Sequence, residues 1–495
     1  MALDNHRRGL EILLILIMTL ASLSSINHFH DWGGDFAQYL NNAKDLVTGN
    51  TTQQREILDH ENFTPLSRGA GFSLLLSPLY SLFHDQIAAY TTLISIAFIF
   101  VTLILFRFFL HQSFQPVVGL LLTLCFALNP DVFVQKLEIL PTFPFLILLY
   151  IGFIWFNQKQ DRQVLLLGII SGLMVSFRNV GWVFVLAVCL HLGFHLLRHF
   201  QWSAVLRLMA YLLVVSIVDI VVKWIVFRTL SFENLAWYDS VFTPGQMWEK
   251  MQENIRYYYD LFHLFFRQYL IRLPFTYYEK VFLLFVLMGF LTRLKQWKLT
   301  DTFLVIYMML ILSYFWQSGM RFLVPVLPIV LTYMGFGLQW LTGFLSRGRK
   351  PAILMATVLL SGLLLAGQLG QTMKIWSRAK NPVNGPQLTD AAAAFSYVEN
   401  NISPTEPIAF HKPWVLHHFT DRISMAINPK DGLKGFSMRY FEDKMTRFEV
   451  KYVLVGINPE DRAIYNKDLV SAVGSKADFS EIWSNDSFVL LVKEE

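Results

Sequence analysis

The sequence predicts an α-helical protein that crosses a membrane many times and ends in a small soluble α/β domain. Of its 495 residues, 54% are hydrophobic and 16% are charged, whereas soluble domains carry about 25% charged residues. Apolar runs that approach the roughly 20 residues of a membrane-spanning helix recur along the chain. From residue 388 the composition changes to that of a soluble domain.

The apolar runs predict about eleven membrane-spanning helices. They cover residues 10–26, 87–110, 116–129, 139–156, 164–177, 180–197, 204–227, 279–291, 300–316, 322–345 and 351–371. The first run follows Arg7 and Arg8 without a clear small-residue cleavage site, so we expect an uncleaved anchor. Segment 69–83 is short and contains Pro78. We expect it to lie along or dip into the membrane surface; if it spans, one weak run must be dropped.

The distribution of Lys and Arg predicts the orientation. With the amino terminus inside, every cytoplasmic connection long enough to count carries Lys or Arg; these are 157–163, 198–203, 292–299 and 346–350. The positive-inside rule therefore predicts a cytoplasmic amino terminus and a periplasmic or extracellular carboxyl terminus. We expect a multi-pass protein of a bacterial inner membrane. Its transmembrane domain is 1–371, with the first outer loop at 27–86, and its outer domain is 372–495.

The outer domain shows the pattern of alternating helices and strands. LTDAAAAFSYVENN predicts a helix that begins at Thr389 or Asp390. PIAFH and KYVLVG predict short buried strands, and FSEIWSNDSFVLLVKE predicts two strands joined at 485–487. His411, His417 and His418 flank Trp414. These side chains form no recognisable catalytic set, so we expect an accessory domain that contacts an acceptor.

Several classes of protein are excluded by what the sequence lacks. Gly-rich phosphate loops, HExxH, CxxC and Gly-x-Ser-x-Gly motifs are absent, and no basic block indicates nucleic-acid binding. Cys125 and Cys189 both fall in apolar runs, so a disulfide framework is not expected. Chemistry is therefore expected from ionisable residues at the outer membrane surface, where charge is costly unless it is used.

The first outer loop contains two acids just beyond the first span, Asp31 and Asp35. Apolar residues recur at helical spacing from Phe36 to Val47, which predicts a surface helix that begins at Asp35. An Asp at this place has two interpretations. It caps the helix, or it takes part in chemistry.

Three segments together resemble the GT-C superfamily of polyprenyl-phosphate-sugar-dependent glycosyltransferases. DFAQYLNNAKDLVTGN looks like the acidic first-loop motif, with Asp35, Tyr39 and Gly49 in matching places. TPLSRGAGFSLLLSPLYSLF looks like the second element of that loop, and GMRFLVPVLPIVLTYMGFGL resembles the late span with Arg321, Pro325 and Pro328. The relatives are protein O-mannosyltransferases and lipid A aminoarabinose transferases. The resemblance implies a GT-C-like fold.

The resemblance also implies a chemistry. A sugar on a lipid phosphate has a good leaving group, so transfer needs a base for the acceptor hydroxyl and cations for the phosphate. Asp35 is the candidate base, with Asp31 and Tyr39 as substrate contacts. Candidate phosphate ligands are Arg68, Arg178 and Arg321. Arg68 is equally an ordinary loop charge, and Arg321 an interface anchor, whereas Arg178 lies in a tight apolar turn.

One family feature is missing. The second outer loop reads KLEILPTFPFLIL, without the acid that usually precedes Pro-Phe. Glu138 is the candidate substitute, with Asp131 as the alternative. His28, His30 and Asp31 form a compact group; no cofactor is assigned, and a divalent metal stays an open alternative.

The sequence therefore predicts a glycosyltransferase that moves a monosaccharide from a polyprenyl-phosphate carrier to a glycan, lipid or protein acceptor at the outer face, with inversion. One alternative is a transporter or flippase of envelope lipids, because Asp219 and Lys223 lie one turn apart within an apolar run. The missing acid leaves a catalytically inactive GT-C-like scaffold as a second alternative.

Overall fold

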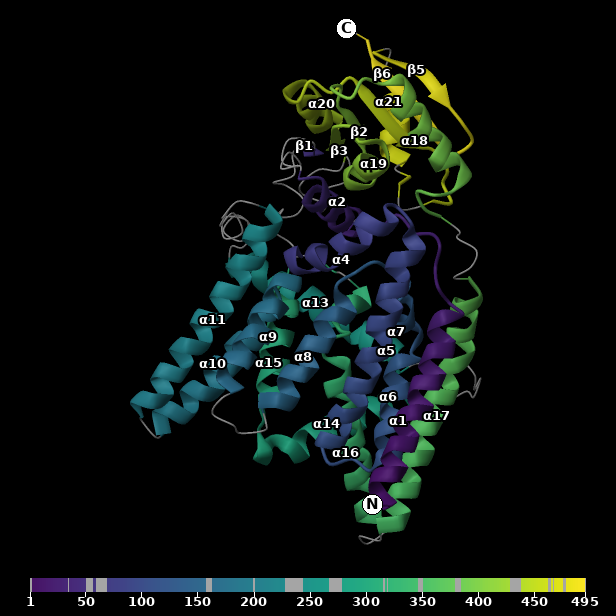
Figure 1. The fold of residues 1–495 in the computed structure, drawn as a ribbon. Coiled ribbons are helices and arrows are strands. Elements are labelled where there is room, and N and C mark those ends of the chain that lie inside the picture. Colours follow the sequence, from purple (N-terminus) through teal and green to yellow (C-terminus); the bar gives the residue numbers. More distant parts are fainter. Residues whose placement is uncertain are drawn as a thin grey trace. The chain divides into compact units, whose positions relative to one another are not determined.

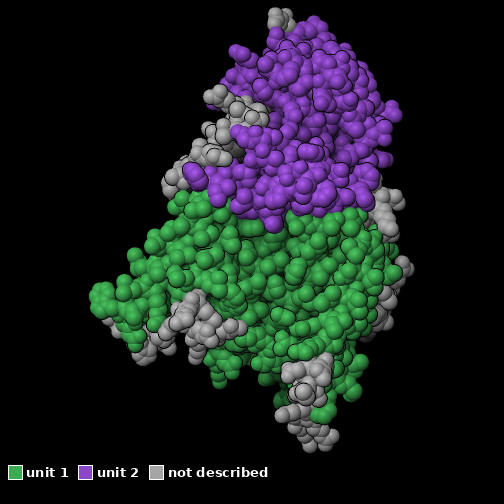
Figure 2. All heavy atoms as spheres, in the orientation of Figure 1, with its two compact units in different colours: residues 1–26, 91–222, 232–380 green, residues 27–90, 223–231, 381–495 purple. Residues whose placement is uncertain are grey.

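The computed structural model describes residues 2–33, 35–49, 57–58, 69–156, 163–198, 201–227, 244–266, 278–314, 317, 319–345, 350–378, 384–427, 438–461, 464–465, 467–474 and 478–494. The chain forms two compact units (Figure 2). Unit 1 comprises Met1–Ile26, Thr91–Val222 and Phe232–Lys380. Unit 2 comprises Asn27–Tyr90, Lys223–Ser231 and Asn381–Glu495. The expected division grouped the first outer loop with the spans, whereas the compact units group it with the tail.

A helix coincides with each apolar run that the sequence marks as a span (Figure 1). These are α1 (Ala2–Leu23), α5 (Ile87–His111), α6 (Pro116–Ala127), α8 (Thr142–Phe156), α9 (Gln163–Phe177), α10 (Gly181–Arg198), α11 (Trp202–Phe227), α14 (Tyr278–Arg293), α15 (Leu299–Ser313), α16 (Leu327–Leu345) and α17 (Lys350–Arg378). Among the described residues, three stretches are long and apolar enough to cross a membrane: Ile87–His111, Trp202–Phe227 and Thr357–Trp376. The number of spans therefore remains a prediction.

Unit 1 also contains shorter elements between these helices. They are α7 (Pro130–Gln135), α13 (Pro244–Phe265), and the 3-10 helices η2 (Leu294–Gln296) and η3 (Gly319–Phe322). Helix α13 packs against α15, and α7 packs against η3. Helices α1 and α17 lie side by side in Figure 1, and the indole N–H of Trp376 donates to the backbone oxygen of Ser24.

Helices α14 and α16 cross with their backbones in contact. A Cβ atom added at Gly289 would lie 1.8 Å from the backbone oxygen of Tyr333, and one added at Gly337 would lie 2.0 Å from that of Phe285. Only glycine allows such an approach, and small residues at helix crossings are typical of membrane proteins. This contact fixes α16, whose amino-terminal end follows Arg321.

Unit 2 is built around a six-stranded sheet. Its strands are β1 (Ile57–Leu58), β2 (Ile408–Phe410), β3 (Ser424–Ala426), β4 (Tyr452–Gly456), β5 (Phe479–Ser484) and β6 (Phe488–Lys493), in the order β1-β3-β2-β4-β6-β5. The first four strands in this order are parallel, and β6 and β5 join antiparallel. The helices are α2 (Asp35–Thr48), α4 (Ala70–Phe83), α18 (Thr389–Asn401), α19 (Pro413–Thr420), α20 (Met438–Arg447) and α21 (Lys467–Gly474). The predicted tail helix and strands are confirmed.

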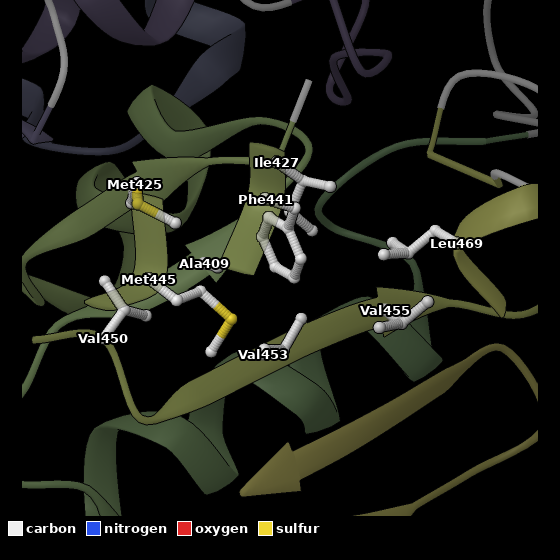
Figure 3. Close-up of a cluster of buried hydrophobic side chains, with 9 residues drawn as sticks. All are labelled: Ala409, Met425, Ile427, Phe441, Met445, Val450, Val453, Val455 and Leu469. Carbon is white, nitrogen blue, oxygen red and sulfur yellow. The ribbon is translucent and has the colours of Figure 1, made fainter. Parts of the chain in front are cut away.

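The two faces of the sheet are covered by different elements. On one face, Phe441 and Met445 of α20 and Leu469 of α21 pack against strand side chains such as Val453 (Figure 3). On the other face, the ring of Phe395 from α18 packs against Phe410 of β2 at 6.1 Å. Each strand therefore has apolar side chains on both faces, as expected of parallel strands covered on both sides.

The first outer loop supplies two parts of this α/β fold. Trp32 is 2% exposed and packs at 5.9–6.2 Å against the rings of Phe395, Phe410 and Phe488. Strand β1 pairs with the edge of β3. These two anchors bracket α2 in the sequence, so the helix that begins with Asp35 is tied to the tail on both sides.

Helix α2 begins at Asp35, as the spacing predicts, but its surface position is wrong. All eight residues from Phe36 to Ala43 are buried, including the polar Gln38, Asn41 and Asn42. The helix packs against α4 and α19. The amide of Asn41 donates to the backbone oxygen of Trp414 at 3.2 Å. Periodicity identified the helix, but it did not show that two neighbouring helices cover it.

Candidate functional site

Asp35, the candidate base, is the first residue of α2 and is half-buried. A carboxylate in the first turn is favoured by the partial positive charge of the helix amino terminus. The ammonium group of Lys412 also interacts with Asp35. Asp35 therefore lies where its ionised form, the form that accepts a proton, is stabilised.

Asp31 precedes this helix in a fixed turn. Its Oδ1 accepts the backbone N–H of Gly33 at 2.8 Å and lies 3.2 Å from Nδ1 of His30. Burial raises the pKa of Asp31, but the bonds from His30 and Gly33, with the charge of Lys412, hold that pKa below its usual range. The ring of His30 stacks on Phe36 at 3.8 Å. The turn therefore has one defined geometry.

Tyr39 lies one turn beyond Asp35 and is 3% exposed. Its ring meets Phe72 of α4 edge-on at 5.1 Å. Gly69 lies against the ring: its φ is +70°, and an added Cβ atom would be 2.3 Å from Cε1 of Tyr39. Both the left-handed backbone and the close contact require glycine. Tyr39 therefore holds α2 against α4 by packing.

Arg178 and Arg321, the candidate phosphate ligands of unit 1, lie near the same aromatic ring. Arg178 follows α9, and its Cζ is 6.0 Å from the ring of Phe322; Cζ of Arg321 is 5.7 Å from that ring. Arg178 also lies 5.7 Å from the ring of Phe145. Although 143 residues separate them by number, the fold brings the two guanidinium groups together.

The segment that carries Arg321 is held from two sides. The hydroxyl of Tyr307 on α15 donates to the backbone oxygen of Phe322 at 2.8 Å. On α13, the hydroxyl of Tyr257 accepts the backbone N–H of Gly319 at 3.0 Å. Tyr257 belongs to the aromatic run RYYYD, whose interpretation as an interface belt or acceptor groove did not include this contact. It positions the arginine segment.

The remaining predicted residues lie in different places. Glu138 is half-buried in the turn between α7 and α8. Asp131 is in the first turn of α7, where Asn129 caps the helix by accepting from the N–H groups of Asp131 and Val132. Arg68 lies outside the described residues. Asp31, Asp35 and Tyr39 belong to unit 2, and Glu138, Arg178 and Arg321 belong to unit 1.

The metal hypothesis finds no donor set in the part of the chain that the structure describes. Within it, no group of three or more His, Cys, Asp or Glu residues is placed to hold a metal ion. Nδ1 of His30 lies 2.9 Å from the backbone oxygen of its neighbour Asp31.

Three residues at these sites escaped the sequence interpretation. Lys136 is 1% exposed, and its ammonium group donates to the backbone oxygens of Ser22 and Ser25 and to the hydroxyl of Ser95. It joins α7 to α1 and α5. Trp32 and Lys412 are the others. A lysine next to a buried strand was the available signal for Lys412, but only the fold reveals the acids around it.

Comparison with solved structures explains this arrangement. The chain matches apo ArnT from Cupriavidus metallidurans with a TM-score of 0.60 and 12% identity, over 98% of each chain. The match to ArnT bound to undecaprenyl phosphate has a TM-score of 0.56 and 11% identity, again over 98% of each chain. The chain has the GT-C fold. It also matches the Archaeoglobus fulgidus oligosaccharyltransferase tethered with an acceptor peptide, with a TM-score of 0.55 and 12% identity, over 90% of this chain and 69% of that one.

The GT-C fold confirms the resemblance drawn from the first loop and the late span. No protein-family model and no curated protein sequence matches the chain. At 11–12% identity the likeness lies in the fold, so the assignment depends on the arrangement of helices more than on the sequence. Both ArnT structures are matched along their whole length, which includes the tail of this chain.

Proposed function

We propose that this GT-C protein transfers a monosaccharide from a polyprenyl-phosphate carrier to a glycan, lipid or protein acceptor at the outer face of a bacterial inner membrane. The observation that carries the proposal is the full-length fold match to ArnT, one structure of which holds undecaprenyl phosphate. The match covers 98% of each chain and so includes the first loop, the spans and the tail.

The residues support a direct displacement. The acceptor oxygen forms a bond to the anomeric carbon while the bond from that carbon to the phosphate oxygen breaks, and its electron pair leaves with the phosphate. Asp35 takes the proton of the acceptor hydroxyl. Arg178 and Arg321 neutralise the lipid phosphate that is released. A single displacement inverts the anomeric centre. Glu138 is the candidate for the family's second acid.

Transfer is tested with the full chain in nanodiscs and a panel of undecaprenyl-phosphate sugars. Asp35→Asn keeps the shape of the side chain but cannot accept a proton at neutral pH. It should lower the transfer rate by about 100- to 10,000-fold, while thermal stability changes little. Binding of undecaprenyl phosphate should persist. Full activity of Asp35→Asn would remove Asp35 from the mechanism, and Asp31 and Glu138 would be tested next.

The arginine pair is tested by binding of undecaprenyl phosphate itself. Arg178→Met and Arg321→Met should each weaken binding by about 10- to 100-fold, since a hydrogen bond to a charged group contributes about 1.5–3 kcal/mol. Arg439→Met, an exposed arginine of the tail, serves as the matched control. Unchanged affinity in both site variants would contradict a phosphate role for this pair.

A further inference from the structure

The carboxyl ends of β2 and β4 meet at the reversal point of the parallel sheet. From β2 the chain goes to β3 on one side, and from β3 it crosses to β4 on the other side. In open α/β sheets such a point is where ligands bind. Here Lys412 directly follows β2, and Asp461 lies beyond the end of β4.

The first outer loop enters this point. The indole N–H of Trp32 donates to Asp461, and the backbone N–H of His30 donates to the side chain of Gln387 at 2.9 Å. Gly385 contacts the same turn, because an added Cβ atom would lie 2.1 Å from the backbone oxygen of His30. The place that often binds a ligand is therefore filled by the residues that lead to Asp35.

Lys412 is the cation at the centre of this contact. Three carboxylates interact with its ammonium group: Asp35 and Asp31 from the first loop and Asp461 from the tail. Burial lowers the pKa of Lys412, and these three acids oppose that change. The other titratable groups here are His30, which bonds Asp31, and His411, whose pKa is lowered to about 4 by burial and by the charge of Lys412.

We propose that Lys412 is a positioning residue of the transferase site, whose ammonium group holds the Asp31–Asp35 segment against the tail and keeps the carboxylate of Asp35 ionised. This rests on the proposed function. Without the cation, Asp31, Asp35 and Asp461 repel one another in a partly buried place, and each binds a proton more readily. The tail, expected to be an accessory domain for the acceptor, then completes the site of the base.

The kinetic test compares Lys412→Met and Lys412→Arg with Lys467→Met, a matched control on an exposed tail lysine. In Lys412→Met, the acidic limb of the kcat/KM profile should move to higher pH, and kcat at neutral pH should fall about 10-fold or more. Activity should recover partly at alkaline pH, whereas affinity for undecaprenyl phosphate should stay. Lys412→Arg should keep the limb of the wild type. An acidic limb that does not move in Lys412→Met would overturn the proposal.

A second measurement does not depend on activity. The pH dependence of amine labelling at Lys412 is followed by mass spectrometry in the wild type, Asp31→Asn and Asp35→Asn, with Lys467 as internal reference. Loss of a neighbouring carboxylate should let Lys412 lose its proton, and so react, at lower pH. An identical labelling profile in all three proteins would refute the role of Lys412. If labelling shifts but no sugar donor is turned over, the proposed function fails and the placement of Lys412 stands.

Discussion

The indole N–H of Trp32 donates a hydrogen bond to the carboxylate of Asp461, which lies 429 positions further along the chain. Trp32 belongs to the first outer loop, and Asp461 belongs to the tail. Because the same indole fills a gap among Phe395, Phe410 and Phe488, the tail lacks part of its core without the loop. The two segments therefore fold together.

Trp32→Ala tests this dependence. It removes a side chain that is 2% exposed, and such truncations cost about 3–5 kcal/mol. The melting transition of the full chain in detergent should move to lower temperature, and the tail should become sensitive to protease. Trp248→Ala, at a tryptophan that is 57% exposed, is the control and should leave both unchanged. Equal behaviour of the two variants would show that the tail folds without Trp32.

Gly69→Ala should separate α2 from α4. Its backbone is left-handed, which costs a non-glycine residue about 1–2 kcal/mol, and its added methyl group would collide with Tyr39. Gly49 has a similar φ of +73° but open space around it. Gly49→Ala therefore measures the backbone cost alone, and Gly69→Ala should lose clearly more stability and also activity. A similar loss in both variants would mean that Tyr39 moves aside easily.

Acid should destabilise unit 2 before its carboxylates titrate. Burial, with nearby Lys412, lowers the pKa of His411 to about 4; burial, with Lys44 and His417, lowers that of His418 to about 3. Since an unfolded histidine has a pKa of about 6.5, the unfolded chain binds more protons between these values. The free energy of unfolding should therefore fall as pH drops from about 6.5 toward 4, by up to about 3 kcal/mol for His411.

Thermal melts across this pH range check the histidine prediction. His411→Asn should flatten the decline, because its side chain does not titrate. His84→Asn, at an exposed histidine with a φ of 47° that Asn tolerates, should keep the slope of the wild type. If His411→Asn retains that slope as well, the buried histidine does not account for the acid sensitivity.

The orientation is tested by reporter fusions after Glu495. The Lys and Arg in the short connections predict that the carboxyl terminus lies outside the cytoplasm. A periplasm-active reporter should therefore be active there, and a cytoplasm-only reporter should be silent. The reverse pattern would invert the proposed face of the reaction.

The elements were the most predictable part of the molecule. Local patterns predicted the α2 start at Asp35 and the strands β4, β5 and β6, because spacing and turn residues act within a few positions. The candidate site was less accessible. The spacing of the first loop pointed to Asp35 and Tyr39, but the grouping of Arg178 and Arg321 around Phe322 depends on how α9 and η3 pack. The interpretation of α2 as a surface helix failed because its cover comes from α4 and α19.

By itself, the sequence determined which segments become helices and strands, the apolar character of the spans, and a GT-C resemblance that depends on the order of three segments. These properties follow from short-range periodicity and composition. Only the tertiary structure decided that the first loop belongs with the tail, that Trp32 completes its core, and that Lys412 meets Asp35. Such contacts join residues hundreds of positions apart, and their energy depends on burial and charge neighbours that exist only when the chain is folded.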